Sequence, residues 1–282
     1  MRFGIKTAPQ QCTWPEMLDV WRTADEIELF ESAWNFDHFY PLVEPSTGPC
    51  MESWVTLSAL AQATRRIRVG AMVNGTPYRH PAVLANMAAS LDIVSGGRLE
   101  LGLGAGWHEP ECDAYGIELL PMKQRMDRFE EYVPVVISLL ENEETDHSGK
   151  YFQLKKARCE PKGPQRPRPP IVIGGQGEKR TLRVVARFAD HWNLPFAKPG
   201  RFKAKNEVLL GHCAEVGRDP SEITRSVQIA FGADEAPEEA AKKAAALGEA
   251  GVDLVIFTLR VPYVAAGVEP LARALEGLAG SD

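Results

Sequence analysis

The chain has 282 residues, of which 44% are apolar and 25% are charged. This composition is that of an ordinary globular protein and excludes a disordered or fibrous chain. The 32 basic and 38 acidic residues leave a net charge of −6, so the sequence offers no electrostatic footprint for nucleic acid or an anionic membrane. The length fits two small domains or one α/β barrel.

Short apolar runs alternate with helical patterns along nearly the whole chain. Eight runs are predicted as strands, at residues 2–6, 32–37, 67–73, 98–103, 171–174, 190–194, 225–231 and 253–259. Apolar residues at helical spacing follow each of them, at residues 14–30, 52–64, 81–94, 126–140, 179–188, 202–216, 238–250 and 268–278. This alternation indicates a parallel sheet covered by helices, and eight units predict a closed (β/α)8 TIM barrel. A doubly wound open sheet is the alternative.

Residues 143–170 interrupt the alternation. They contain HSGKYFQL, which is typical of a hairpin, and PKGPQRPRPP, which has little helix or strand potential. We interpret the segment as an insertion and not as a domain linker, because the strand–helix rhythm resumes after it. The prediction is therefore a single barrel domain over residues 1–282.

Other features of the sequence bear on the cellular location of the protein. The first ten residues lack the apolar core of a signal peptide, and no apolar run is long enough for a membrane span. The five cysteines are widely spaced and form no CxxC pair, which favours reduced thiols. We expect a soluble, cytoplasmic protein that has neither a nucleic-acid nor a membrane partner.

The active site of a barrel lies at the carboxyl ends of its strands. The second predicted strand leads into Asp37 and His38. Histidine is the side chain that titrates near neutrality without help, and an adjacent carboxylate could hold or tune it. The functional interpretation is that His38 moves protons or hydrogen-bonds a cofactor ring, and the alternative is a structural histidine.

Two glycine-rich segments also follow predicted strands. Residues 102–107 (GLGAGW) match neither the dinucleotide-binding fingerprint nor a P-loop, but clustered glycines let a ligand approach the backbone. Residues 174–177 (GGQG) precede a helix and indicate an anion site or a tight turn. Residues 108–113 carry metal-ligand side chains without HxxxH or HExxH spacing, so no metal is predicted. The sequence also lacks a GxSxG nucleophile elbow.

Taken together, these segments resemble the luciferase-like flavin/deazaflavin oxidoreductases, and most of all the subgroup thought to use coenzyme F420. The resemblance runs in consistent order from about residue 2 to residue 260. The matching pieces are Trp34…Asp37-His38-Phe39…Pro41, the run from Tyr78 to Ala85, Ser95-Gly96-Gly97-Arg98, Gly102 to Trp107, Glu111…Tyr115-Gly116 and Ile173-Gly174-Gly175.

The resemblance implies a (β/α)8 barrel with the cofactor ring at the strand ends. It makes His38 the catalytic histidine, with Asp37 beside it, and places a non-prolyl cis peptide at Met72-Val73, behind the ring. The residues expected to line the ring and side chain of the cofactor are Gly104, Ala105, Gly106 and Trp107. Those expected toward its phosphate are Glu111, Tyr115, Gly174, Gly175 and Gln176.

The sequence departs from one branch of the family. Trp107 stands where the F420-dependent sugar-phosphate dehydrogenases have a catalytic glutamate, and Leu42 replaces a tryptophan of that branch. Sugar-phosphate oxidation is therefore not expected, and proton transfer rests more on His38. The expected reaction is hydride transfer between C5 of F420 and a small organic substrate.

Two alternatives stay open at this point. The first is an FMN-dependent luciferase-like monooxygenase, in which the flavin N5 supplies the oxygen chemistry that a deazaflavin lacks. The second is a non-catalytic cofactor-binding barrel. Members of the family are often dimers, so a homodimer is one assembly that the resemblance allows.

Overall fold

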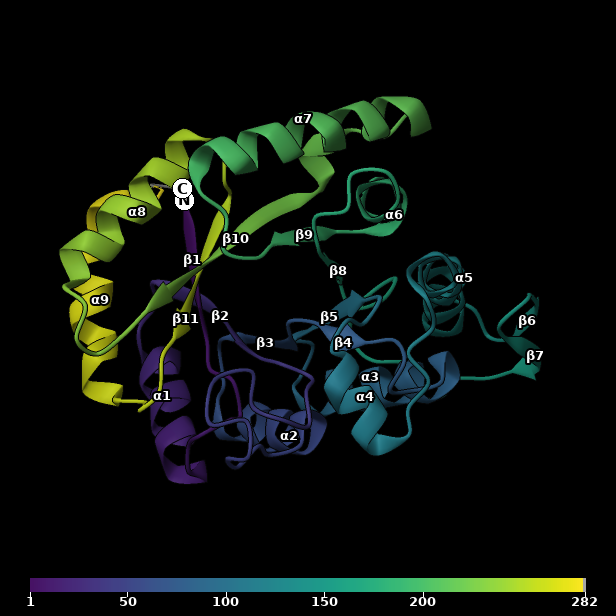
Figure 1. Ribbon diagram of the computed structural model, residues 1–282, viewed down its shortest axis with the longest axis horizontal. Coiled ribbons are helices and arrows are strands. Elements are labelled where there is room, and N and C mark those ends of the chain that lie inside the picture. The colour runs from purple at the N-terminus through teal and green to yellow at the C-terminus, as the bar shows by residue number, and fades with distance from the viewer. Residues whose placement is uncertain (281–282) are drawn as a thin grey trace.

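The computed structural model describes residues 1–280. Its centre is a barrel of eight parallel strands surrounded by helices (Figure 1). A two-residue strand, β4 (Asn74–Gly75), lies beside the end of β5. The barrel strands are β1 (Arg2–Lys6), β2 (Phe30–Asn35), β3 (Arg68–Ala71), β5 (Leu99–Gly104), β8 (Ile171–Gly174), β9 (His191–Leu194), β10 (Thr224–Phe231) and β11 (Leu254–Leu259).

Two pairings close the barrel. The last strand, β11, pairs with β1 in parallel, so that Leu254 lies opposite Arg2. On the other side β3 pairs with β5, Val69 opposite Leu99. The order around the ring is therefore β1–β2–β3–β5–β8–β9–β10–β11. The predicted (β/α)8 barrel is confirmed, and the open doubly wound alternative is wrong.

Helices cover the outside of the barrel. Local signals set their starts: Thr13 and Glu16 form a capping box at the first helix, and Pro81 occupies the first turn of the third. The covering helices are α1 (Trp14–Glu26), α2 (Ser53–Ala63), α3 (Pro81–Val94), α5 (Met122–Glu141), α6 (Thr181–Phe188), α7 (Pro199–Val216), α8 (Pro237–Glu249) and α9 (Val268–Leu275). Within the described residues, no helix is long and apolar enough to span a bilayer.

The strands separate two cores. Side chains such as Ile5, Val69 and Phe257 point outward and join the large core between the strands and the helices. The alternate positions point into the barrel, where Trp34 and Ile256 belong to a second, smaller apolar cluster. Because side chains alternate along a strand, each of the eight short runs serves both layers.

Some predicted boundaries are wrong. The helix expected over residues 14–30 ends at Glu26, because the chain turns and Phe30 begins β2. The Arg66 guanidinium holds this turn by donating to the carbonyls of Ala24, Ile27 and Phe30.

The insertion does contain the expected hairpin, β6 (Thr145–Ser148) with β7 (Gln153–Ala157). A short helix that the sequence did not predict, α4 (Glu109–Tyr115), follows β5.

Candidate active site

A cavity of about 570 Å³ opens at the carboxyl ends of the barrel strands. Apolar side chains form most of its wall, among them Phe36, Val73 and Phe129. Titratable or amide side chains line it at only a few places. These are Lys6, Asp37, His38, Asn74, Tyr78, Gln176, Asn193 and Gln228. A largely apolar cleft with a few polar groups is the usual form of a small-molecule site.

His38 lies just beyond the end of β2 and lines this cavity. Its Nδ1 is 2.9 Å from Oε1 of Glu111. Its ring forms T-shaped pairs with the rings of Phe36 and Trp107, with centroid separations of 5.0 and 5.6 Å. Its Nε2 has no hydrogen-bond partner within residues 1–280. The histidine is therefore fixed through one nitrogen while the other is left for a ligand.

Glu111 comes from α4 and its side chain is fully buried. Besides His38, it accepts from the amides of Phe39 at 2.6 Å and Tyr40 at 3.2 Å, and from the Tyr78 hydroxyl. Burial by itself raises the pKa of this carboxyl, but the hydrogen bonds from His38 and Tyr78 outweigh it and lower the pKa to about 2. The group is therefore ionised at neutral pH.

The ionised Glu111 carboxylate determines which ring nitrogen of His38 carries the hydrogen. A carboxylate accepts and never donates, so Nδ1 of His38 carries the hydrogen in both the neutral and the charged ring. In the neutral ring, Nε2 is then the acceptor. When the ring is protonated, the negative charge of Glu111 stabilises the imidazolium, as the carboxylate of a catalytic triad does.

Asp37 has a different partner. The sequence offered this neighbouring carboxylate as one that could hold or tune His38, but it does not bond to the histidine. Its Oδ2 accepts from Arg79 at 2.6 Å and from the amide of Gly75 at 3.1 Å. Burial raises the pKa of Asp37, although Arg79 opposes the effect. Its buried Oδ1 has no partner within the described residues. Arg79 also pairs with Glu52, so it is not free to meet a ligand. A catalytic role for Asp37 stays a prediction.

Gly102 and Gly104 in β5 and Gly174 at the end of β8 make room for the side chain of Val73. A Cβ on Gly104 would lie 2.7 Å from Cγ2 of Val73, and one on Gly102 or Gly174 would lie 3.0 Å from Cγ1. The Met72-Val73 peptide is cis, as the resemblance implies. Val73 lies in the cavity wall, and the glycines give its side chain the space it occupies there. The sequence indicated these glycines only as places where a ligand approaches the backbone.

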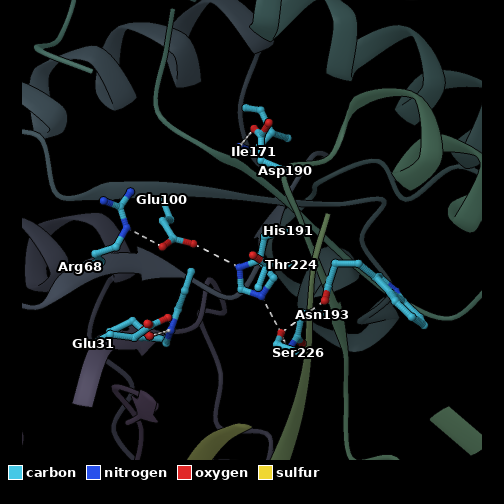
Figure 2. A network of polar contacts seen from close by, with 12 residues as sticks. Glu31, Arg68, Glu100, Ile171, Asp190, His191, Asn193, Thr224 and Ser226 are labelled. Atoms are coloured by element: carbon cyan, nitrogen blue, oxygen red, sulfur yellow. Dashed lines mark hydrogen bonds and ion pairs between the residues drawn. The ribbon is translucent and has the colours of Figure 1, made fainter. Parts of the chain in front are cut away.

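A network of polar contacts joins His191, Ser226, Glu100 and Arg68 (Figure 2). His191 contacts the Ser226 hydroxyl through Nε2 at 2.6 Å and Glu100 through Nδ1 at 3.1 Å. Arg68 completes the network on the far side of Glu100, at 2.6 Å. The arrangement is similar to an acyl-transfer triad, but Ser226 is completely buried and does not line the cavity. With no path for a substrate, we interpret the network as structural.

The predicted site residues mostly come together. All of them line the cavity except Glu111 and Tyr115. Glu111 lies behind His38, and the ring of Tyr115 stacks on that of Phe39 with a centroid separation of 4.8 Å. Trp107 is 60% exposed at the mouth. Gln176 accepts a hydrogen bond from Arg201. The cofactor contacts assigned to these residues stay predictions.

One cluster has the composition of a metal site. Ligand atoms of His38, His108 and Glu111 lie within 4.8 Å of one another. Nδ1 of His108 has no hydrogen-bond partner within residues 1–280. The Glu111 carboxylate, however, is already satisfied by donors of the chain, which a metal would have to displace. We therefore propose no metal there.

Sequence reasoning missed the polar floor of the cavity. Lys6, Asn193 and Gln228 end or lie within strands whose alternate residues are apolar. The sequence gives no signal for them, since a charged residue at the end of a buried strand points into a barrel as readily as out of it. Tyr78 was noted only as part of a family motif, and its contact with Glu111 was not foreseen.

Comparison with known proteins identifies the family of the chain. The family model described as luciferase-like monooxygenase matches residues 1–276. Pyrimidine monooxygenase RutA of Methylobacterium radiotolerans is 34% identical over 194 residues, which are 66% of this chain and 49% of that protein. The chain spans about half the length of the curated relatives it matches.

Solved structures share the fold. An F420-dependent secondary alcohol dehydrogenase, solved with an F420-acetone adduct, superposes with a TM-score of 0.87 at 20% identity, over 98% of this chain and 99% of that one. Riboflavin lyase with modified FMN superposes with a TM-score of 0.82 at 15% identity, over 99% and 91%. The barrel and the family model agree: the chain belongs to the luciferase-like monooxygenase family.

Proposed function

We propose that the protein is an F420-dependent oxidoreductase that transfers a hydride between C5 of the deazaflavin and a carbon of a small organic substrate. The observation that carries this proposal is His38, clamped at Nδ1 by Glu111 in a mainly apolar cavity. The motif resemblance to the F420 subgroup and the full-length likeness to an F420-dependent alcohol dehydrogenase support F420 as the cofactor.

The residues present fit a ring of this kind. A volume of about 570 Å³ is within the range of small-molecule pockets. The unpartnered Oδ1 of Asp37 offers an acceptor for a ring N–H. Met72, Val73 and residues 104–107 would flank the ring, and the turn at residues 174–177 would meet the phosphate. When bound, the deazaflavin supplies the two electrons as a hydride.

The protein supplies the proton. In the reductive direction, a substrate carbonyl carbon gains the hydride and its oxygen needs a proton, which His38 gives from Nε2. In the oxidative direction, neutral His38 accepts the proton of the alcohol at the same atom. Glu111 holds the ring in the tautomer that both directions require and stabilises the charged form. The apolar wall limits access of water to the reacting carbon.

FMN is the second candidate cofactor. The 34% identity to pyrimidine monooxygenase RutA and the fold of riboflavin lyase favour it. Such an enzyme would consume oxygen and insert one of its atoms into the substrate. The cytoplasmic location stays a prediction, and a homodimer stays one assembly that the resemblance allows.

A two-arm turnover assay tests the proposal. In the anaerobic arm, reduced F420 is mixed with the protein and a panel of ketones, aldehydes and enones, and reoxidation is followed by absorbance. In the aerobic arm, reduced FMN replaces F420 and substrate-dependent oxygen consumption and oxygenated products are measured. Turnover in the first arm, lost in His38→Ala, supports the proposal. Oxygenation in the second arm without turnover in the first overturns it.

A further inference from the structure

The mouth of the cavity is apolar, and the proton transfer proposed above does not explain why. Four large apolar side chains line the cavity and are also between 37 and 64% exposed. We call them the rim: Leu42, Trp107, Met122 and Phe196. The other exposed residues of the described lining are Gln176 and Gly177. Exposed apolar side chains that gather around one opening mark a binding surface, whereas scattered ones need no explanation.

The rim is assembled from four separate parts of the chain. Leu42 lies in the segment after β2, and Trp107 follows β5. Met122 is the first residue of α5, and Phe196 lies in the turn after β9. Because segments far apart in sequence each place an apolar side chain at the same opening, the rim is a feature of the cavity and not of one exposed loop.

Local contacts hold the rim in place. The Trp107 ring packs against the ring of His38, with a centroid separation of 5.6 Å. The amide of Leu42 donates to the buried side chain of Gln10 at 2.6 Å. Phe196 has a φ of +48°, a left-handed conformation that a bulky residue rarely adopts. Backbone strain of this kind persists where the surrounding structure fixes it, typically at functional sites, so the rim is a preformed surface.

The rim carries no charge. Among the described residues of the lining, Lys6 is the only lysine or arginine. It is buried and donates to the Met72 carbonyl and to Gln228. Gln176 accepts from Arg201 and belongs to the turn proposed to meet the cofactor phosphate. A charged group placed against the rim would lose its hydration without gaining a partner, so the rim fits an uncharged, apolar ligand.

The position of the rim identifies its occupant. Cofactor and substrate enter the cavity through this opening, so a second copy of the chain or another protein seated on the rim would close the active site. Trp107 lies beside His38, the residue proposed to move the proton. A molecule whose reacting oxygen bonds to His38 therefore reaches the rim with the rest of its structure, and the occupant is the substrate.

We propose that the rim binds an extended apolar group of the substrate, an alkyl chain or an aromatic ring, while the attached carbonyl or alcohol carbon reacts beside His38. The inference rests on the proposed function and names its substrate class: uncharged hydrophobic ketones and aldehydes, or the corresponding alcohols. The rim residues are then specificity-determining residues for that reaction.

A series of methyl ketones from 2-butanone to 2-octanone tests this inference in the anaerobic assay with reduced F420. Burial of one methylene corresponds to about fourfold in binding, so a partly open rim should raise kcat/KM about two- to fourfold per methylene. The gain should appear in KM with kcat nearly constant, because the rim contacts are the same in the ground state and the transition state. Calorimetry on the protein saturated with oxidised F420 should show octanoate binding at least about tenfold more weakly than 2-octanone.

Two variants remove apolar side chains from the rim: Leu42→Asn and Phe196→Asn. Both positions are exposed, and asparagine tolerates the left-handed backbone of Phe196, so both variants should fold. Each should lower the ratio of kcat/KM for 2-octanone to that for 2-butanone about 3- to 10-fold. Val83→Asn is the matched control and should keep the ratio, since Val83 is a similarly exposed side chain on α3 that lines no part of the cavity.

The outcomes separate the two proposals. If the wild type turns over the ketones with equal kcat/KM at every length, or octanoate binds as tightly as 2-octanone, the role of the rim is refuted while the proposed function stands. If neither reduced F420 nor reduced FMN supports turnover of any ketone, the proposed function fails. Calorimetry of the ketone series then decides the rim by itself: affinity that rises with length upholds an apolar binding site, and equal affinities or no binding refute it.

Discussion

Replacing Glu111 by glutamine tests the clamp on His38. All four groups that reach this carboxylate are donors: His38, Phe39, Tyr40 and Tyr78. A glutamine amide has the same shape but turns an NH2 group toward some of these donors in either orientation. The Glu111→Gln variant therefore loses at least one hydrogen bond and sets donor against donor in a buried site.

The magnitude follows from the pKa of Glu111. Folding lowers it from 4.5 to about 2, and each pKa unit corresponds to about 1.4 kcal/mol, so the ionised carboxylate stabilises the fold by up to about 3 kcal/mol. Because the folded pKa is the lower one, this stabilisation is complete above pH 4.5. It is lost progressively as the pH falls from 4.5 toward 2.

Urea unfolding of the wild type and Glu111→Gln measures this difference. We expect a gap of about 2–3 kcal/mol in the free energy of unfolding at pH 7, shrinking by about 1.4 kcal/mol per pH unit below pH 4.5. Glu109→Gln is the control, because Glu109 lies exposed in the same helix. An equal gap at pH 7 and pH 3.5, or none at pH 7, would refute the reasoning.

Two further predictions concern the cavity. His38→Ala should lower turnover by about 10²–10⁴-fold, the usual contribution of a general acid or base. His212→Ala on α7 is the control and should leave turnover unchanged. Wild-type turnover in His38→Ala would show that the histidine takes no part in the reaction. Gly104→Ala should destabilise the fold by about 1–3 kcal/mol, because its Cβ would lie 2.7 Å from Val73. Gly211→Ala, at an open position in α7, should be neutral or stabilising, and equal urea midpoints for the two variants would contradict this packing argument.

The sequence predicts the barrel well because strand patterns are local. Each run, such as 171–174, is short and apolar enough to be recognised by itself, and the count of eight implies closure. The end of α1 is harder, because the Arg66 side chain that stabilises the turn comes from about forty residues later. α4 has only seven residues and too few apolar positions for a helical pattern.

The site is predictable only in part, because its contacts join residues that lie far apart in the sequence. The motif identifies His38 and the residues that line the cavity, but adjacency in sequence suggested Asp37 as the partner of His38. The fold instead brings Glu111 to the histidine from seventy-three residues away and turns Asp37 toward Arg79. Lys6 was missed because a five-residue strand does not reveal which way its last side chain faces.

Titration of the protein with oxidised F420 and with FMN, side by side, tests the central claim most directly. Both are followed by fluorescence quenching under the same conditions, which requires no substrate. The account predicts that F420 binds at least about tenfold more tightly than FMN, a difference of about 1.4 kcal/mol in binding free energy. Tight binding of FMN without binding of F420 would contradict it.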